Sequence, residues 1–213
     1  MKRIVRLVTM LIVASGFAAA QLYSTAETVG KGKNSLLFSP NAVMVSGAPN
    51  AEVNLCALFH GLTNRVDVAV GFGSMTLEKR TQVSGIVGAN VNIYKSEVVN
   101  FAVYNLLNTA FNKRSESSEL WWYSAFISSH NLKWHKEPFA TVYAGFAPVV
   151  PIGDTHNKFF TWDQPQYNLP LGVAIPKGPW VLQVEYNAPI KVAKSGPKVQ
   201  MFGVGINYAW GGL

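Results

Sequence analysis

The sequence predicts a closed antiparallel up-and-down β-barrel that crosses a membrane, with about ten strands and with eight or twelve as alternative counts. Three observations lead to this all-β fold class. Apolar residues recur with a period of two along much of the chain. No run of about 18 apolar residues follows residue 20, although 49% of all residues are hydrophobic and only 14% are charged. Short and longer polar connections alternate between the predicted strands.

The first 20 residues have the three-part layout of a secretory signal peptide. Three basic residues precede position 7, residues 7–13 are apolar except for one threonine, and three alanines end at Ala20. This apolar stretch is shorter than the ~20 residues that a spanning helix needs. We therefore expect residues 1–20 to be a signal peptide and residues 21–213 to form one outer-membrane barrel domain.

The net charge does not point to a nucleic-acid-binding protein, and the cysteine content excludes a fold stabilised by internal disulfides. The formal net charge is +7, and removal of the three basic residues of the signal leaves +7 − 3 = +4. This scattered excess does not indicate a nucleic-acid partner. The single cysteine, Cys56, cannot form an internal disulfide, so other forces must stabilise an exported chain. We expect Cys56 to be a small buried side chain.

The period-two pattern gives each predicted strand one apolar face and one small or polar face, because successive strand side chains point to opposite sides. The clearest segments are 66–73, 83–93, 180–187 and 202–210. The predicted strands, with ends defined to within about two to four residues, are 35–45, 52–60, 66–75, 83–94, 98–110, 119–130, 139–149, 167–176, 180–187 and 198–210. Pro40 makes the first strand the weakest, since proline is confined to edges, strand starts and bulges; residues 21–30 are an alternative.

The connections give the barrel an orientation. The short connections are 61–65, 95–97 and 177–179, and the longer ones are 76–82, 111–118, 151–166 and 188–197. Tight periplasmic turns and longer external loops are typical of bacterial barrels, in which the strand number is even. Both termini are therefore expected in the periplasm. The connection 131–138 is long for a periplasmic turn.

Aromatic residues fall where the predicted strands meet the two membrane interfaces, and their amphipathic rings suit the head-group zone. Trp134, Trp180, Tyr208 and Trp210 are expected at the periplasmic end, and Trp121 at the external end. The alternative is that these are core aromatics of a soluble exported β-sandwich that binds carbohydrate or a partner.

Two segments carry a family resemblance. Glu-Thr-Val-Gly-Lys-Gly-Lys at 27–33 and Gly-Leu-Thr-Asn-Arg-Val-Asp-Val at 61–68 resemble a pattern in bacterial outer-membrane barrels described as transporters or left uncharacterised. The alternation at 202–210 resembles the C-terminal strand that barrel-assembly machinery reads, except that three residues follow Trp210. The resemblance implies this fold and an outer-membrane location, with little about a substrate.

One external loop offers an alternative catalytic function. Asp154 and His156 lie two apart on the longest predicted loop, and an Asp that orients a His can position a general base. The spacing is similar to the Asp-x-His of omptin surface proteases, but no second acidic pair lies on another external loop. A surface hydrolase is therefore an alternative to a non-catalytic barrel.

Other candidate groups give no site. Ser128 and His130 invite comparison with lipid A deacylases, but the predicted topology puts them at the periplasmic end, whereas lipid A is attacked from the outer leaflet. His60 and His135 join His130 near one rim, yet nothing brings the three imidazoles together for a metal. We therefore expect no catalytic residue, no cofactor and no metal site.

The residues on the inward faces of the strands determine whether the barrel interior is an open channel or is filled by side chains. A barrel of about eight strands is filled by its own side chains, whereas about sixteen strands leave a channel. The expected inward residues are mostly Gly, Ala, Ser, Asn and Gln, with Glu185 as an unpaired inward charge. Both a thin wet passage and a packed interior remain compatible with this set. The predicted function is non-catalytic: structural, or narrow and porin-like. The predicted partners are outer-membrane lipid, lipopolysaccharide at the basic loops, and the assembly machinery during biogenesis.

Overall fold

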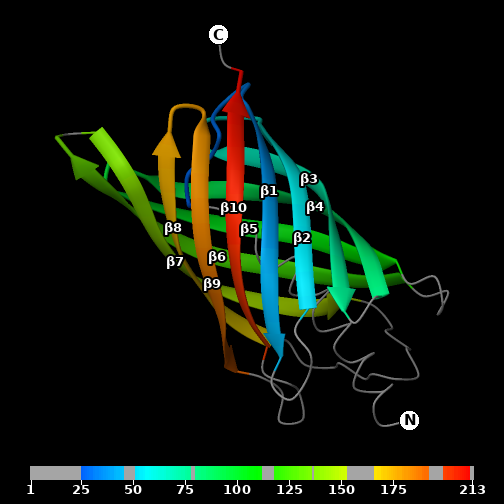
Figure 1. The fold of residues 1–213 in the computed structure, drawn as a ribbon. Coiled ribbons are helices and arrows are strands. Elements are labelled where there is room, and N and C mark those ends of the chain that lie inside the picture. Colours follow the sequence, from blue (N-terminus) through cyan, green and yellow to red (C-terminus); the bar gives the residue numbers. More distant parts are fainter. Residues whose placement is uncertain are drawn as a thin grey trace, which may run out of the picture.

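A computed structural model describes residues 25–45, 51–77, 80–111, 118–135, 137–152, 166–191 and 199–211, which form a closed antiparallel barrel (Figure 1). No helix in these ranges is long and apolar enough to cross a membrane. The strands are β1 (Asn34–Val45), β2 (Ala51–Gly61), β3 (Val66–Leu77), β4 (Arg80–Lys95), β5 (Val99–Phe111), β6 (Ser118–Trp134), β7 (Glu137–Ile152), β8 (Gln166–Lys177), β9 (Trp180–Lys191) and β10 (Val199–Trp210). The segment predicted as the signal peptide, residues 1–20, lies outside the described ranges.

All ten predicted strands are present, and their order around the barrel is the order of the chain. Each strand pairs with its sequence neighbours, and β1 pairs with β10 to close the ring. The first strand does contain Pro40, which lies opposite Asn54 of β2. The ladder between β1 and β10 is interrupted at Ser39 and Pro40, between the pairs Phe38 with Ile206 and Asn41 with Gly203. Residues 25–30, part of the alternative first strand, form no strand.

Two predicted connections are instead paired strand. The segment 131–138 was expected to be a long turn, but Asn131 lies opposite Thr141 and Trp134 lies opposite Glu137, so that β6 and β7 form a hairpin. The segment 76–82 was expected to be an external loop, but Leu77 lies opposite Arg80. Both segments were predicted as connections because their side chains are polar. Polar side chains indicate contact with water, and the backbone pairing of the strands continues into such segments.

The outward face of the barrel is apolar and the inward face is mixed. Outward side chains such as Val70 and Phe72 are 58% and 61% exposed, whereas inward neighbours such as Ala69 are buried. Cys56 was expected to be buried, but it shares the outward face and is partly exposed. A closed ring with an apolar exterior buries that exterior only in lipid. The closure therefore excludes the β-sandwich alternative.

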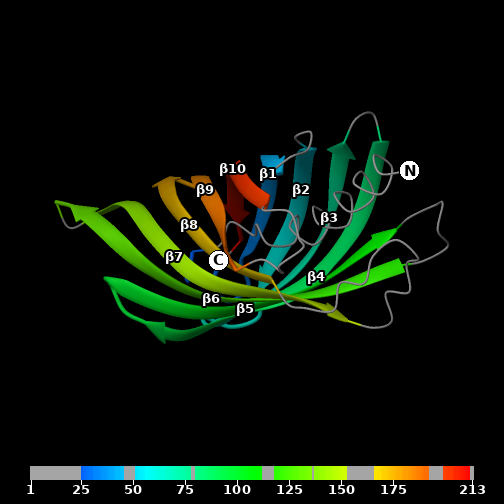
Figure 2. The ribbon, with the colours of Figure 1, turned by 90° about the horizontal axis from the view of Figure 1, so that it is seen from below.

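The two ends of the barrel differ. We call the end where β1 begins and β10 finishes the terminal end, and the opposite end the loop end (Figure 1). The terminal end also holds the short connections 62–65, 96–98 and 178–179, together with the end of β6 and the start of β7. Short turns are periplasmic in barrels of this type. Seen from below, the strands form a curved wall (Figure 2).

The closed ring should resist mild denaturation as a unit. We expect the purified mature chain to need detergent and to migrate differently on a gel before and after boiling, because the unboiled barrel keeps its compact shape. The measurement is electrophoresis of both samples from detergent extracts. A chain that stays soluble without detergent and migrates identically in both samples would contradict this fold.

Candidate functional site

The lumen is packed with large side chains as well as small polar ones. The fully buried residues include Leu37, Leu55, Leu106 and Met201, and three buried tyrosines come from β5, β6 and β7. The expectation that inward residues are mostly Gly, Ala, Ser, Asn and Gln was therefore wrong in part. These large apolar residues occupy inward positions, so an apolar side chain does not by itself identify the lipid-facing side of a strand. They fill the lumen between the small residues.

Glu185 lies at the centre of this packing. Its side chain is 2% exposed, and the Tyr143 hydroxyl donates a hydrogen bond to Glu185 Oε2 at 3.0 Å. Tyr143 on β7 reaches β9 because β8 has Gly172 between them: a Cβ at position 172 would lie 2.2 Å from the tyrosine ring. The expectation of an inward Glu185 is confirmed, but the carboxylate is not unpaired.

A chain of polar side chains continues from Glu185 toward the terminal end. Asn207 Nδ2 donates to Gln183 Oε1 at 2.9 Å, and Ser35 Oγ donates to Asn207 Oδ1 at 3.3 Å. These bonds join β9, β10 and β1 across the inner wall, where β10 places Gly203 and Gly205 opposite Glu185 and Gln183. Internal partners lower the cost of burying polar groups. This part of the inner wall is therefore polar, and hydrogen bonds hold its side chains in place.

Residues 25–33, here called the N-terminal segment, cross the terminal end of the barrel (dark blue in Figure 1). Ala26 is completely buried, and Val29 packs against the hydrophobic core. Asn92 Nδ2 donates to the carbonyl oxygen of Ala26, and Asn90 Nδ2 to that of Glu27 at 3.4 Å. The rim of the lumen thus binds the main chain of this segment.

Asp67 binds the same segment from β3. Its Oδ2 accepts a hydrogen bond from the Val29 main-chain nitrogen at 3.0 Å. The Thr28 hydroxyl donates to the main-chain oxygen of Asn64 at 2.9 Å, and the Lys31 nitrogen donates to Asn64 Oδ1 at 3.2 Å. Because Asp67 is only 2% exposed, the segment covers the carboxylate that binds it.

The Glu27 carboxylate joins two further strands. Asn131 Nδ2 of β6 donates to Glu27 Oε1 at 2.7 Å, and Asn100 Nδ2 of β5 donates to the same oxygen at 3.3 Å. Thr141 orients Asn131 by donating to its Oδ1 at 2.8 Å. Hydrogen bonds to a charged acceptor are about twice as strong as neutral ones. Glu27 therefore ties the segment to β5 and β6, two and three strands beyond the strand that carries Asp67.

The segment enters β1 through a close backbone contact with β2. Gly32 nitrogen donates to the Gly61 oxygen at 2.8 Å, and Gly61 nitrogen donates to the Lys33 oxygen at 2.9 Å. A Cβ at position 61 would lie 1.9 Å from the Gly30 oxygen, so only glycine allows this approach. Gly30 and Gly32 have positive φ angles of 91° and 72°, which glycine adopts readily.

One ion pair lies at the same end of the barrel. Lys133 Nζ on β6 is 2.9 Å from Glu97 Oε2 in the turn between β4 and β5. Lys133 lowers the pKa of Glu97 below its ordinary value of 4.5, first through this hydrogen bond and then through its charge. An exposed pair of this kind contributes little to stability.

The structure places the predicted interface aromatics at strand ends. Trp134, Trp180, Tyr208 and Trp210 are all exposed at the terminal end, and the Trp180 and Tyr208 ring centroids lie 4.6 Å apart. Trp121 lies in β6 opposite Pro151, and its side chain is outside the described part. Their contact with membrane head groups stays a prediction.

The predicted chemical groups do not come together. Asp154 and His156 lie outside the described residues, so the surface hydrolase stays untested. Ser128 faces outward in β6, and His130 lies opposite Val99, where β5 begins at the terminal end. His60 binds Asn34 through Nδ1 at 2.8 Å. Within the described ranges, no group of three or more His, Cys, Asp or Glu side chains is placed to hold a metal.

Sequence reasoning missed the residues that bind the N-terminal segment. The period-two pattern did place Asn90 and Asn92 on the polar face of their strand, and it marked Asp67 in the same way. Their common ligand is a stretch without regular structure, which leaves no periodic signal. Asn131 was missed because it fell in a segment expected to be a turn.

Comparison with known proteins shows the fold and no family. No protein-family model matches the chain, and no curated protein sequence matches it. LpxR from Salmonella typhimurium superposes with a TM-score of 0.51 at 9% identity, covering 83% of each chain. The NanC porin superposes with a TM-score of 0.43 at 9% sequence identity, and the match covers 84% of this chain and 100% of the porin chain.

A bacterial polysaccharide outer membrane secretin gives a TM-score of 0.46 at 10% identity. That match covers 84% of this chain and 66% of the secretin chain, so the chain spans just under two thirds of the secretin's length. The likeness to LpxR, the closed ring and the apolar exterior together define a class: this chain has the fold of a bacterial outer-membrane β-barrel. Its location is the bacterial outer membrane, as the sequence predicts.

The contact of Tyr143 with Gly172 should make that glycine sensitive to a single methyl group. We expect Gly172→Ala to displace the ring and break its bond to Glu185, lowering the free energy of unfolding by about 1–3 kcal/mol, as overpacking does. Reversible urea unfolding in lipid vesicles measures this loss. Ser74→Ala, on the outward face, is the matched control; equal stabilities for the two variants would contradict the packing.

The ion pair at the terminal end gives a pH prediction. A lowered pKa for Glu97 means that its attraction to Lys133 stabilises the fold above about pH 4.5 and is lost as the pH falls through the lowered value. Lys133→Met should raise the pKa of Glu97 back toward 4.5, as measured by NMR titration of its carboxyl group. Lys177→Met should leave it unchanged.

Proposed function

We propose that this chain is a non-catalytic, structural outer-membrane barrel whose lumen is closed to passive diffusion. The occupied terminal end is the observation that carries the proposal. The N-terminal segment covers Asp67 and the asparagines of the rim, and the large side chains behind it fill the lumen. A barrel of ten strands lies near the size at which side chains alone fill the interior.

A second candidate is a narrow passage that opens when the N-terminal segment leaves. The polar wall formed by Gln183, Glu185 and Asn187 favours this candidate, because three successive inward positions of β9 carry buried polar side chains. Small residues on β8 and β10 flank the wall, so polar groups line one side of the lumen. Release of the segment would expose this wall to the periplasm.

The partners of the barrel belong to the same proposal. The outward face of β10 is apolar from Phe202 to Trp210, which supports recognition by the assembly machinery that inserts such strands. Lipid contacts the apolar band, and lipopolysaccharide would meet the basic residues of the external connections, most of which lie outside the described part.

Channel recording in planar bilayers tests the closed lumen. We expect the full mature chain to give no steady channel openings. Glu27→Ala removes the acceptor of two asparagine amides, and bonds to a charged group contribute about 1.5–3 kcal/mol each. If the second candidate holds, this variant conducts and the parent does not. Glu97→Ala, which removes another carboxylate at the same end, is the matched control and should not conduct.

A labelling experiment checks the segment independently of conductance. Ala26→Cys in a Cys56→Ser background places a thiol at a fully buried position. We expect a water-soluble maleimide to label it slowly, and Glu27→Ala to raise the rate roughly ten-fold or more, since about 1.4 kcal/mol is a factor of ten. Steady conductance by the parent, or equally fast labelling of parent and variant, would overturn the closed lumen.

A further inference from the structure

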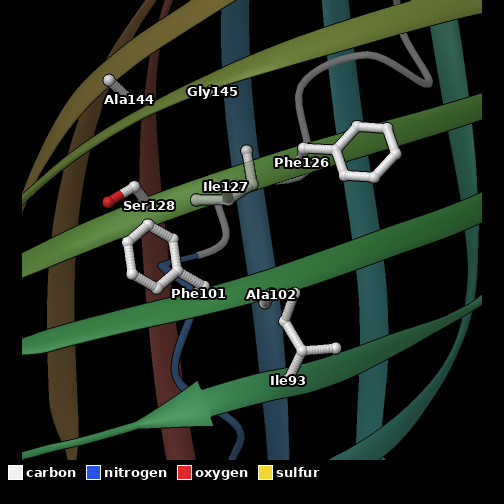
Figure 3. Close-up of a pocket in the computed structure, with 8 residues that line it drawn as sticks. All are labelled: Ile93, Phe101, Ala102, Phe126, Ile127, Ser128, Ala144 and Gly145. Atoms are coloured by element: carbon white, nitrogen blue, oxygen red, sulfur yellow. The ribbon is translucent and has the colours of Figure 1, made fainter.

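The outer wall of the barrel carries an apolar groove that the closed lumen does not explain. It crosses β4 to β7, has a volume of about 430 Å³, and is lined by Ile93, Phe101, Phe126, Ser128, Ala144 and Gly145 with the backbone between them (Figure 3). This volume lies within the range of roughly 300–1,000 Å³ that small-molecule sites have.

The groove exists because small residues interrupt a wall of large ones. Ser128 lies opposite Ala144, and Gly145 lies opposite Ile127, whose side chain is buried inside the barrel. Phe101 and Phe126, 43% and 53% exposed, rise on either side of the paired Ala102 and Ile127 (Figure 3). The aromatic side chains are therefore walls, and the sheet itself is the floor.

A bulge in β4 forms the end of the groove nearest the terminal end. The register between β4 and β5 shifts between Asn92 and Tyr94, which leaves Ile93 without a partner on β5. A bulge increases local twist and re-aims side chains. Ile93 is 59% exposed and closes this side of the groove, while the Tyr94 and Phe101 ring centroids lie 6.0 Å apart beside it.

The groove runs from the rim toward the middle of the apolar band. Ile93 lies two positions before Lys95, where β4 ends, whereas Gly145 lies in the middle of β7. Four neighbouring strands spaced about 4.8 Å apart span about 14 Å. The chain region of one leaflet is about 15 Å, half of a hydrocarbon core of ~30 Å. The length of the groove across the strands is therefore comparable to that of one lipid chain.

The rim beside Ile93 has the chemistry of a head-group zone. Tyr94 and the exposed Trp134 are aromatic residues of the type found at membrane interfaces. Lys95 ends β4, and Lys133, paired with Glu97, follows on β6. Cationic and aromatic groups thus lie where a phosphate-bearing head would be if its chain followed the groove.

We propose that this groove binds one acyl chain of a glycerophospholipid whose head group lies at the terminal end. The surface around the groove already faces lipid, so the occupant belongs to the phase that covers the wall. A slot between two aromatic side chains fits a single linear hydrocarbon chain. A second barrel would present a broad pleated face, which does not enter such a slot.

Photolabelling tests the proposal on the full mature chain. The probe is phosphatidylethanolamine with a photoreactive diazirine in one acyl chain, in proteoliposomes, with labelled peptides mapped by mass spectrometry. We expect labels to concentrate on the strand segments around Phe126 and Ala144. Ala144→Phe should lower that labelling several-fold, because the new ring fills the groove.

Ala42→Phe is the matched control, since Ala42 also faces outward and is exposed on β1. It should leave the labelling of β6 and β7 unchanged. The gel shift on boiling verifies that both variants fold. Labels spread evenly over all outward faces, or labelling that Ala144→Phe does not reduce, would overturn the proposal and leave only ordinary lipid contact.

A second copy of the chain is the competing occupant. Ala144→Cys in a Cys56→Ser background would then form interchain disulfides faster than Ala42→Cys in the same background. That result would assign the face to an interface between barrels and overturn the lipid proposal. Equal, slow cross-linking of both thiols supports it.

Discussion

The pairing of β1 with β10 converts a ten-stranded sheet into a ring, and the other features of the molecule depend on that closure. In lipid, each unpaired backbone amide or carbonyl costs several kcal/mol, so an open edge is not compatible with the membrane. The ring leaves no edge there, and it also separates two surfaces with opposite requirements. The outer surface has to be apolar, while the inner one has to be filled or wet.

Small residues leave space on both the inner and the outer surface of the barrel. The alternation of side chains along a strand does not by itself create this space. Inside, Gly172 leaves room for Tyr143 to cross one strand and reach Glu185. At the mouth, Gly61 lets the chain pass against β2 before β1 begins. Outside, the small residues Ser128 and Ala144 leave a groove between large apolar side chains. At Gly172 and Gly61, the absence of a side chain creates the space that another group occupies.

The sequence was sufficient for the strands because alternation is a local property. Each strand displays its own apolar face, so residues such as Phe202, Val204 and Ile206 reveal it without knowledge of their neighbours. The connection 131–138 was predicted to be too long because Asn131 and His135 are polar, and polarity indicates contact with water and not the end of strand pairing. The binding of Glu27 by Asn100 and Asn131 was not predictable, since those residues are 73 and 104 positions away and meet only after the ring has formed.

The interruption of the β1–β10 ladder at Pro40 has a consequence for assembly. Asn34 pairs with Trp210, a separation of 210 − 34 = 176 positions, whereas hairpin partners such as Leu77 and Arg80 are almost adjacent. Closing a longer loop costs more chain entropy, so this junction is the least favourable contact to nucleate. It also contains a residue that cannot donate a main-chain hydrogen bond. The last junction to pair is thus one whose ladder is interrupted at Ser39 and Pro40, which makes it the natural point at which a nascent barrel stays open while it enters the membrane.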